Sequence, residues 1–262
     1  MFDGWARVAA DDMKLSLLKE VIAAKPLATV TAVILAGGLG TRLRSVVTDR
    51  PKVLIEIRGR PFLAYLFDQL TTVGVRNVVL CTGYLGDEVK AMFGSSYGGL
   101  RLVYSQESSP LGTAGALRLA LPLLNSDPVL VMNGDSFCWA DLSAFWTWHC
   151  AKGVGASLLL TKVSDTNRDG RVTIKPNGRV KSFMEKGEAS GPGWINGGIY
   201  LIKQDLVRAI PLGRTVSIEK EMFPVWIHQG LYGYKSECRF IDIGTPESYA
   251  LAEQFFTMER SA

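Results

Sequence analysis

A glycine-rich turn near the start of the chain carries residues that could bind phosphate. Residues 32–52 read AVILAGGLGTRLRSVVTDRPK, in which a short apolar run ends in Gly-Gly-x-Gly. Glycines permit a sharp turn and let backbone N–H groups approach a ligand without an obstructing Cβ. An ordinary tight turn is the alternative, but the flanking cations Arg42 and Lys52 favour a phosphate-binding loop. The chain has no Walker A pattern, G-x-x-x-x-G-K-[ST]. The dinucleotide fingerprint G-x-G-x-x-G also fails, because Leu43 stands where its third glycine would be.

Two aspartates farther along the chain are candidates for a cation site. Asp135, in NGDS, follows an apolar run, and Asp242, in FIDIGT, stands inside another. A carboxylate at such a position is costly to bury unless it is paired or bound to a metal. Mg²⁺ in proteins takes one or two carboxylates together with substrate phosphates. A turn cap is the alternative role for either residue.

The length and composition fit one large α/β domain or two small ones, and they argue against several functional classes. The chain has 262 residues, 47% of them hydrophobic, and its net charge of +4 is well below that of a nucleic-acid-binding arm. No apolar run reaches the ~20 residues of a membrane span. Four scattered cysteines without a Cys-x-x-Cys pair, and two histidines, argue against structural zinc. Several cysteines lie in apolar segments, so we expect reduced thiols and a cytoplasmic location.

The order of the apolar runs predicts the fold class. We predict strands at residues 31–36, 76–82, 100–105 and 127–135, with helices between them at 61–74, 85–94 and 113–124. This alternation implies right-handed βαβ units and a parallel sheet. The runs are apolar throughout, as in strands covered on both faces. The expected fold is therefore α/β, a Rossmann-like three-layer αβα arrangement with a mostly parallel central sheet.

Beyond Asp135 we predict strands with little helix between them. Residues 155–163, 170–186, 194–202 and 238–244 read as strands, with a hairpin turn at 175–179. Residues 217–230 are predicted to be helical up to the residue before Pro224. A closing helix is predicted to begin with Thr245 as its N-cap and Pro246 at its first position.

These patterns divide the chain into an extension and one domain. Residues 1–28 are an N-terminal extension to which we assign no chemistry, and residues 29–262 form a single domain. Within it we expect a nucleotide-binding half, 29–136, and a mixed half, 137–262, that closes over a ligand bound at the strand ends.

Four motifs together resemble the sugar-1-phosphate nucleotidylyltransferase family. They read LAGGLGTRL, DRPKVLIEIRGRPFLAY, PLGTAGAL and VMNGDSF. The family signature G-G-x-G-T-R-[LM]-x(n)-P-K is met between Gly37 and Lys52. The likeness extends from about Ala32 to about Phe256.

The resemblance implies transfer of a nucleotidyl group to a sugar 1-phosphate, with release of pyrophosphate. The sugar phosphate is already anionic at neutral pH, so it needs no general base, and the obstacle is repulsion between two polyanions. Positioning and positive charge should therefore supply the catalysis. By the resemblance, Asp135 and Asp242 hold the catalytic Mg²⁺. Arg42, Lys52 and Lys186 complete the catalytic set.

The resemblance also implies the binding residues. Those for the nucleotide are Leu35, Ala36, Gly37, Gly38, Gly40, Thr41, Arg42, Gly112 and Thr113. Those for the sugar phosphate are Gly134, Gly170, Glu185, Lys186 and Asn196. The alternatives are a helix cap at Thr113, a surface ion pair at Glu185 and Lys186, and an Asn-Gly turn at Asn196. One departure is Asp169 before Gly170, where relatives often carry an aromatic residue.

Within the family, the motifs are most similar to guanylyltransferases for D-glycero-α-D-manno-heptose 1-phosphate. The expected ligands are therefore GTP and that sugar 1-phosphate, with Mg²⁺ and without nucleic acid or membrane. Mannose-1-phosphate guanylyltransferases, and short uridylyltransferases for N-acetylmuramate or glucose 1-phosphates, are the alternatives. A non-catalytic nucleotide-sugar sensor on the same fold is an alternative of a different class.

Overall fold

An eight-stranded sheet runs through the molecule, in the order β13-β9-β12-β7-β1-β4-β6-β5. The computed structural model describes residues 26–38 and 50–257. The parallel strands β7 (Val129–Asn133), β1 (Thr31–Leu35), β4 (Asn77–Thr82) and β6 (Leu100–Gln106) lie side by side. On one side of this group, β12 (Gly193–Ile202) runs antiparallel to β7 and to β9 (Ala156–Val163), and β13 (Leu231–Ser236) runs parallel to β9. On the other side, β5 (Ser96–Tyr97) runs antiparallel to β6. Strands from both predicted halves thus share one sheet.

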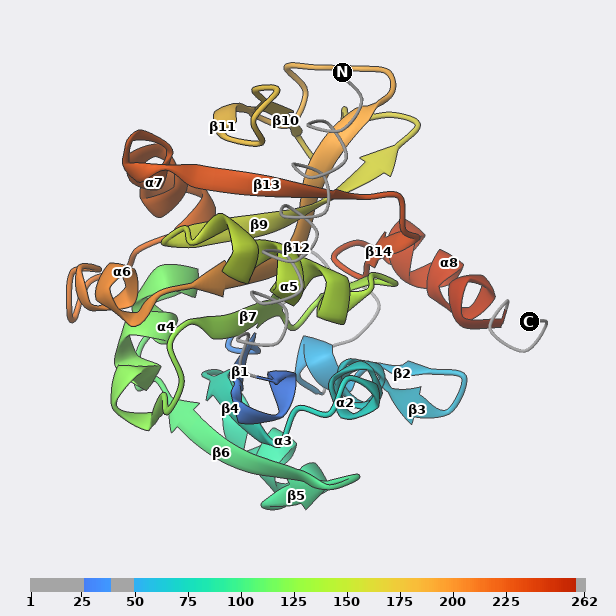
Figure 1. Ribbon diagram of the computed structural model, residues 1–262. Coiled ribbons are helices and arrows are strands. Elements are labelled where there is room, and N and C mark those ends of the chain that lie inside the picture. Colours follow the sequence, from blue (N-terminus) through green and yellow to red (C-terminus); the bar gives the residue numbers. More distant parts are fainter. Residues whose placement is uncertain (1–25, 39–49, 258–262) are drawn as a thin grey trace, which may run out of the picture.

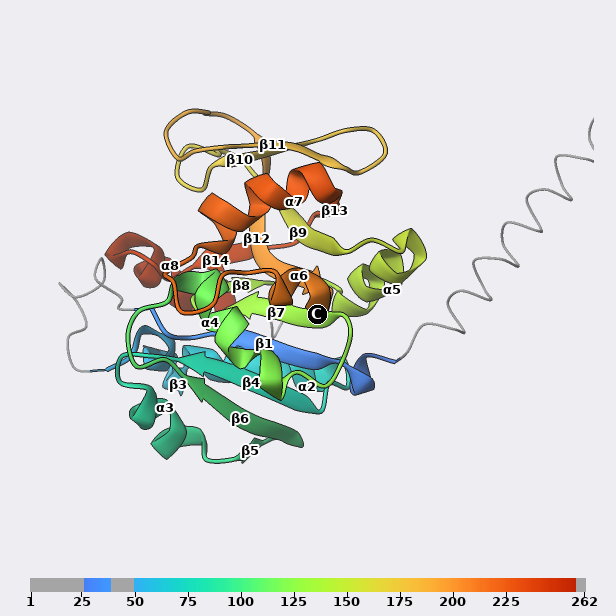
Figure 2. The same ribbon diagram turned by 90° about the vertical axis from the view of Figure 1, so that its left-hand side faces the viewer.

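Helices cover both faces of this sheet (Figures 1 and 2). One hydrophobic cluster includes α2 (Phe62–Thr72), α3 (Gly86–Phe93), α5 (Leu142–Lys152) and α8 (Pro246–Thr257). The other includes α4 (Gly112–Ala120), α6 (Gln204–Arg208) and α7 (Phe223–Gln229). Along β1, Ala32 and Ile34 join the first cluster and Val33 joins the second. The two-sided burial confirms the three-layer prediction.

Smaller elements complete the fold. The two-residue strands β2 (Glu56–Ile57) and β3 (Arg60–Pro61) pair with each other, and β10 (Arg171–Ile174) and β11 (Val180–Met184) form the predicted hairpin. The single-turn helices are η1 (Leu27–Thr29), η3 (Lys52–Leu54), η4 (Leu121–Leu123) and the π-helical η5 (Ile218–Met222). β14 (Phe240–Asp242) pairs with β8 (Ser136–Cys138) in a ladder of their own. None of the helices within the described ranges is long and apolar enough to cross a membrane.

Two helix predictions for the second half were wrong. α5 was missed because its own apolar residues are spread almost evenly around the helix, so its sequence shows no amphipathic stripe. Asp141 caps its start by accepting a hydrogen bond from the N–H of Ala144 at 2.9 Å. Pro224 does not end a helix but lies in the first turn of α7, where the missing N–H is not needed. The predicted cap of α8 is confirmed, since the N–H of Ser248 donates to Oγ1 of Thr245 at 3.3 Å.

Candidate active site

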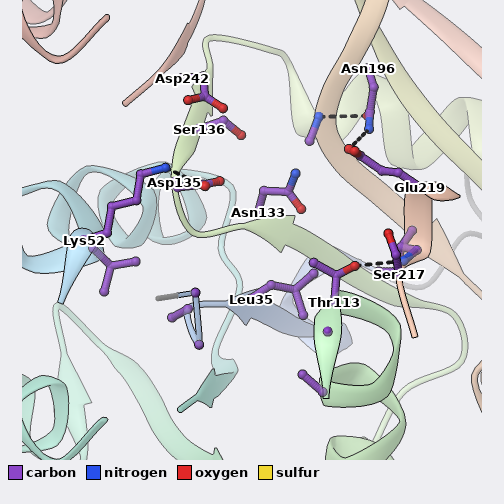
Figure 3. A pocket seen from close by; sticks show the side chains of 18 of the residues that line it. Leu35, Lys52, Thr113, Asn133, Asp135, Ser136, Asn196, Ser217, Glu219 and Asp242 are labelled. Carbon is purple, nitrogen blue, oxygen red and sulfur yellow. Dashed lines mark hydrogen bonds and ion pairs between the residues drawn. The ribbon is translucent and has the colours of Figure 1, made fainter. Parts of the chain in front are cut away.

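A cavity of about 370 Å³ opens at the carboxyl ends of β1 and β7 (Figure 3). Because parallel strands end at the same edge of a sheet, the residues that follow β1 and β7 lie next to each other there. The predicted site residues that line the cavity are Leu35, Ala36, Gly37, Gly38, Lys52, Gly112, Thr113, Asp135, Lys186, Asn196 and Asp242. Gly134, Gly170 and Glu185 are not among its lining residues. Gly40, Thr41 and Arg42 lie outside the described residues, as do residues 1–25 of the predicted extension.

Backbone hydrogen bonds hold the ends of β1 and β7 together. The N–H of Gly134 donates to the carbonyl of Leu35 at 2.9 Å, and the N–H of Ala36 donates to the carbonyl of Cys81 at 2.8 Å. A Cβ at Gly134 would stand 2.6 Å from the Leu35 oxygen, a distance that real Cβ atoms do not reach. Gly134 therefore allows the turn that carries Asp135 to pass close to β1.

The start of α4 forms another wall of the cavity. Gly112 has a φ of +69°, and a Cβ there would stand 2.6 Å from the carbonyl oxygen of Val216. The hydroxyl of Thr113 accepts a hydrogen bond from the N–H of Ile218 at 2.8 Å. Thr113 thus ties α4 to η5 and does not cap its own helix, for which no side-chain cap bond is formed. This contact brings η5, which is distant in sequence, to the rim of the cavity.

Glu107 was not predicted from the sequence, although it lines the cavity. Its Oε2 accepts a hydrogen bond from the N–H of Leu111 at 3.0 Å. Burial raises the pKa of Glu107, and the Leu111 N–H opposes that rise. An acidic residue three positions before Pro110 of the PLGTAGAL motif was the available signal.

Asp135, in the turn between β7 and β8, and Asp242, at the end of β14, lie on the same side of the cavity as Lys52 (Figure 3). Asp242 is in register with Ser136, and the N–H of Ile243 donates to the backbone carbonyl of Asp135 at 2.9 Å. Lys52 Nζ lies 2.7 Å from Oδ2 of Asp135, and only 9% of the lysine side chain is exposed. The β8–β14 ladder therefore brings together two carboxylates that are 107 positions apart (242 − 135) in the chain.

The electrostatics of this pair favour a bound cation. Burial and, next, the negative charge of Asp135 raise the pKa of Asp242, while Lys52 and the N–H of Gly244 act in the opposite direction. Within the described part of the chain, no group of three or more His, Cys, Asp or Glu side chains gathers around one point. A metal here would take two protein carboxylates and leave its other positions to phosphate and water, as Mg²⁺ commonly does.

Asn196 and Glu219 lie across the cavity from these carboxylates (Figure 3). The amide nitrogen of Asn196 donates to Oε1 of Glu219 at 2.8 Å and to the hydroxyl of Tyr200 at 2.9 Å, while its oxygen accepts from Gly198 N–H at 3.0 Å. Both amide hydrogens are thus used. Oε2 of Glu219 has no donor among the described residues, and desolvation among the surrounding protein atoms raises the pKa of this carboxyl. Glu219 was missed because its segment reads only as a helix.

Lys186 lies at the junction of this cavity with a second hollow of about 610 Å³. Both are also lined by Asp169, Phe240 and Asp242. Burial raises the pKa of Asp169, and the charge of Lys186 opposes that rise. Gly170 has a φ of +77° and would place a Cβ 2.6 Å from the Met184 oxygen, so it packs against the end of β11.

Glu185 is exposed at the start of the turn that follows β11. Its N–H donates to the carboxylate of Glu188 at 2.8 Å. Its neighbour Lys186 faces the cavity, so the two adjacent side chains differ in their access to a ligand.

Comparison with known proteins agrees with this geometry. The nucleotidyl transferase family profile matches residues 31–259. A D-glycero-α-D-manno-heptose 1-phosphate guanylyltransferase of Aneurinibacillus thermoaerophilus is 37% identical over 224 residues, which cover 85% of this chain and 96% of that protein. A mannose-1-phosphate guanylyltransferase of Mycobacterium tuberculosis is 36% identical over 224 residues. That match covers 84% of this chain but only 62% of the longer relative.

A solved structure gives the same result. The crystal structure of HddC from Yersinia pseudotuberculosis complexed with GMP-PN matches with a TM-score of 0.77 and 31% sequence identity, over 87% of this chain and 99% of that one. The fold class and the resemblance predicted from the motifs are thereby confirmed. This chain belongs to the nucleotidyl transferase family.

Proposed function

We propose that this chain transfers a guanylyl group from GTP to a sugar 1-phosphate, forming a GDP-sugar and pyrophosphate. The observation that carries the proposal is the meeting of Asp135, Asp242 and Lys52 in a cavity that also contains the residues after β1. This arrangement supplies a cation site and a buried positive charge beside a candidate phosphate-binding turn.

Mg²⁺ is the cofactor that we propose, held by Asp135 and Asp242. Their carboxylates fit a hard divalent cation. Burial and, next, the charge of Asp135 raise the pKa of Asp242, and a bound cation would offset both effects. When bound, the ion stabilises negative charge on the reacting phosphate. Lys52 and Lys186 add positive charge from the protein, and we propose that Arg42 does the same.

These residues would position two anions for an in-line reaction. The second pKa of a phosphate monoester is about 6, so the sugar phosphate arrives as a nucleophile and no side chain must remove a proton. Its oxygen attacks the α-phosphorus of GTP, the bond to the β-phosphate oxygen breaks, and pyrophosphate leaves. No covalent enzyme intermediate is needed, and the protein contributes by orienting the reactants and offsetting their repulsion.

The proposed preference for guanine rests on Glu107. The Watson–Crick edge of guanine presents N–H donors from N1 and N2, whereas uracil presents one N–H between two carbonyls. A carboxylate has only acceptors, so it complements the guanine edge. Glu107 lines the cavity together with Gly37 and Gly112, where we propose that the base lies against the backbone.

For the sugar, we propose that Glu219 accepts hydrogen bonds from hydroxyl groups and that Asn196 holds Glu219 in place. Asn196 donates both amide hydrogens within the protein, whereas Glu219 lines the cavity and its Oε2 has no donor from the described residues. D-glycero-α-D-manno-heptose 1-phosphate is the first candidate acceptor, since the relative that is 37% identical and matched over 96% of its length is named for that substrate. Mannose 1-phosphate is the second candidate.

We also propose that residues 29–262 act as one domain in the cytoplasm, with the nucleotide in the half formed by residues 29–136 and the sugar phosphate in the half formed by 137–262. The pairing of β12 with β7 supports a single unit, because it joins the two halves within one sheet. GTP is a cytoplasmic substrate, which favours that compartment.

The test is a matrix of GTP, UTP, CTP, ATP and dTTP against heptose, mannose, glucose and N-acetylmuramate 1-phosphates, with pyrophosphate release measured in Mg²⁺. We expect the highest kcat/KM for GTP with heptose 1-phosphate. Turnover with UTP and glucose 1-phosphate alone would replace guanylyl by uridylyl transfer. Binding of nucleotide without turnover on any acceptor would favour the sensor alternative.

A further inference from the structure

Two cysteines that are distant in sequence meet beside the β8–β14 ladder. The sulfur atoms of Cys138 and Cys238 are 2.6 Å apart, although 100 residues separate them in the chain. Both are free thiols. Unbonded sulfur atoms ordinarily pack much farther apart, and a disulfide bond measures about 2.05 Å. Only a small movement separates this pair from a covalent bond.

The surroundings of the two thiols differ in a way that suits thiol–disulfide exchange. Cys138 is buried at the end of β8, whereas Cys238 is half-buried and lines a surface hollow of about 420 Å³ with Lys162 and Arg239. The hydrogen bond with Cys138 lowers the pKa of Cys238 to about 6, and the same contact together with burial raises the pKa of Cys138. Cys238 is therefore the accessible thiolate, and Cys138 is the resolving thiol behind it.

We propose that Cys138 and Cys238 form a reversible intrachain disulfide that links the end of β8, which follows Asp135, to the segment that leads into β14, which ends at Asp242. The oxidant is a low-molecular-weight disulfide such as oxidised glutathione. The Cys238 thiolate attacks one of its sulfur atoms and expels one glutathione thiolate. Cys138 then loses its proton and attacks Cys238 Sγ, which expels the second. Two protein thiols are oxidised to a disulfide, and the two expelled glutathione thiolates take up the two protons that the cysteines lose and become two thiols.

The bond should stabilise the fold without disturbing the cavity. The sulfur atoms already lie 2.6 Å apart, so the strands need little displacement. A cross-link that closes a loop of this length removes much of the conformational entropy of the unfolded chain, which predicts a rise in Tm of about 10 °C. Pyrophosphate release by the oxidised protein should stay within about twofold of that of the reduced protein.

The experiment counts thiols in the full chain. Protein is incubated with oxidised glutathione, unfolded and alkylated, and its mass is measured by mass spectrometry. A parallel sample is reduced before alkylation. The reduced protein has four cysteines to alkylate, and we expect two alkyl groups after oxidation, with the linked peptides containing Cys138 and Cys238. In the separate variants Cys138→Ser and Cys238→Ser, oxidation should no longer reduce the number of alkyl groups by two and should no longer raise Tm. Cys150→Ser, which changes a half-buried cysteine elsewhere, should preserve both.

Several results would overturn the proposal. Four alkyl groups after oxidation, a stable glutathione adduct on one cysteine, or a linked pair other than Cys138 and Cys238 would each do so. Peptide mapping of the unmutated protein gives this answer even when a serine variant does not fold. Because the thiol count needs no turnover, it does not depend on the proposed transferase function. A loss of activity well beyond twofold on oxidation would contradict an undisturbed cavity.

Discussion

Replacing Glu107 with glutamine tests the proposed recognition of guanine by this carboxylate. Glutamine has the shape of glutamate, and its carbonyl can still accept the Leu111 N–H that now bonds to Oε2 at 3.0 Å. The change therefore preserves the local hydrogen bond but replaces a charged acceptor by an amide N–H₂ donor. Guanine would then meet a donor where it presents donors of its own.

The expected magnitude follows from the hydrogen bonds that are lost. A hydrogen bond to a charged group contributes about 1.5–3 kcal/mol, and leaving a buried donor unpaired costs a further ~1–3 kcal/mol. A combined loss of about 2.5–6 kcal/mol corresponds to a decrease of about 70-fold to 25,000-fold in kcat/KM for GTP. UTP should lose little, because its carbonyls can accept from the new amide.

The assay measures pyrophosphate release with GTP and with UTP at saturating sugar phosphate, and compares the ratio of their kcat/KM values. A ratio is insensitive to the fraction of folded protein. Glu253→Gln removes an equal charge from an exposed position on α8 and should leave the ratio unchanged. A Glu107→Gln variant whose GTP-to-UTP ratio stays within about threefold of the unmutated protein would refute base recognition by Glu107.

Three further substitutions test other parts of the cavity and the fold. Lys186→Ala should raise the KM for sugar phosphate about 10-fold to 100-fold with little change for GTP, because the proposed contact with the sugar phosphate is lost. Lys181→Ala, on β11 and not among the residues that line the cavity, should change neither. Glu219→Gln should lower kcat/KM more for a hydroxylated sugar 1-phosphate than for its deoxy analogue, and an equal loss for both would remove it from the sugar site. His149 is buried beside Ser157, and burial lowers the pKa of its imidazole from 6.5 to about 4. The folded protein therefore favours the neutral imidazole, and this contribution to stability is fully present above pH 6.5 and is lost as the pH falls from 6.5 toward 4. The free energy of unfolding, measured in urea, should fall by about 2 kcal/mol less between about pH 7 and about pH 4.5 in His149→Gln than in the unmutated protein. The exposed control His228→Gln should show the same fall as the unmutated protein. An unchanged pH dependence in His149→Gln would contradict this prediction.

The first half of the fold and part of the site could be predicted from the sequence because local signals mark them. β1, β4, β6 and β7 are apolar runs bounded by turn residues, and the helices between them have ordinary length. The turn after β1 and Asp135 after β7 are both at strand ends, so a parallel sheet places them together. The nearness of Asp242 could be predicted only from the family resemblance, since β14 pairs with β8 outside the main sheet.

The remainder depends on long-range contacts that leave no local pattern. Glu219 reaches the cavity because Thr113 binds the N–H of Ile218, 105 positions away. Cys138 and Cys238 meet because a separate two-stranded ladder joins their segments. Pro224 misled the prediction because a proline that ends most helices is also compatible with a first turn.

If Asp135 and Asp242 share a divalent cation during nucleotidyl transfer, Asp242→Asn should abolish turnover without destabilising the fold. Burial and Asp135 both raise the pKa of Asp242, so the charged carboxylate costs stability in the folded protein. An asparagine retains the oxygen that accepts from Gly244 N–H but removes that cost. We therefore predict an unchanged or higher Tm together with a fall in Mg²⁺-dependent pyrophosphate release of about 1,000-fold. Binding of Mn²⁺, measured by electron paramagnetic resonance with a non-hydrolysable GTP analogue, should weaken in parallel. A variant that keeps near-normal turnover and Mn²⁺ affinity would show that Asp242 does not hold a catalytic cation with Asp135.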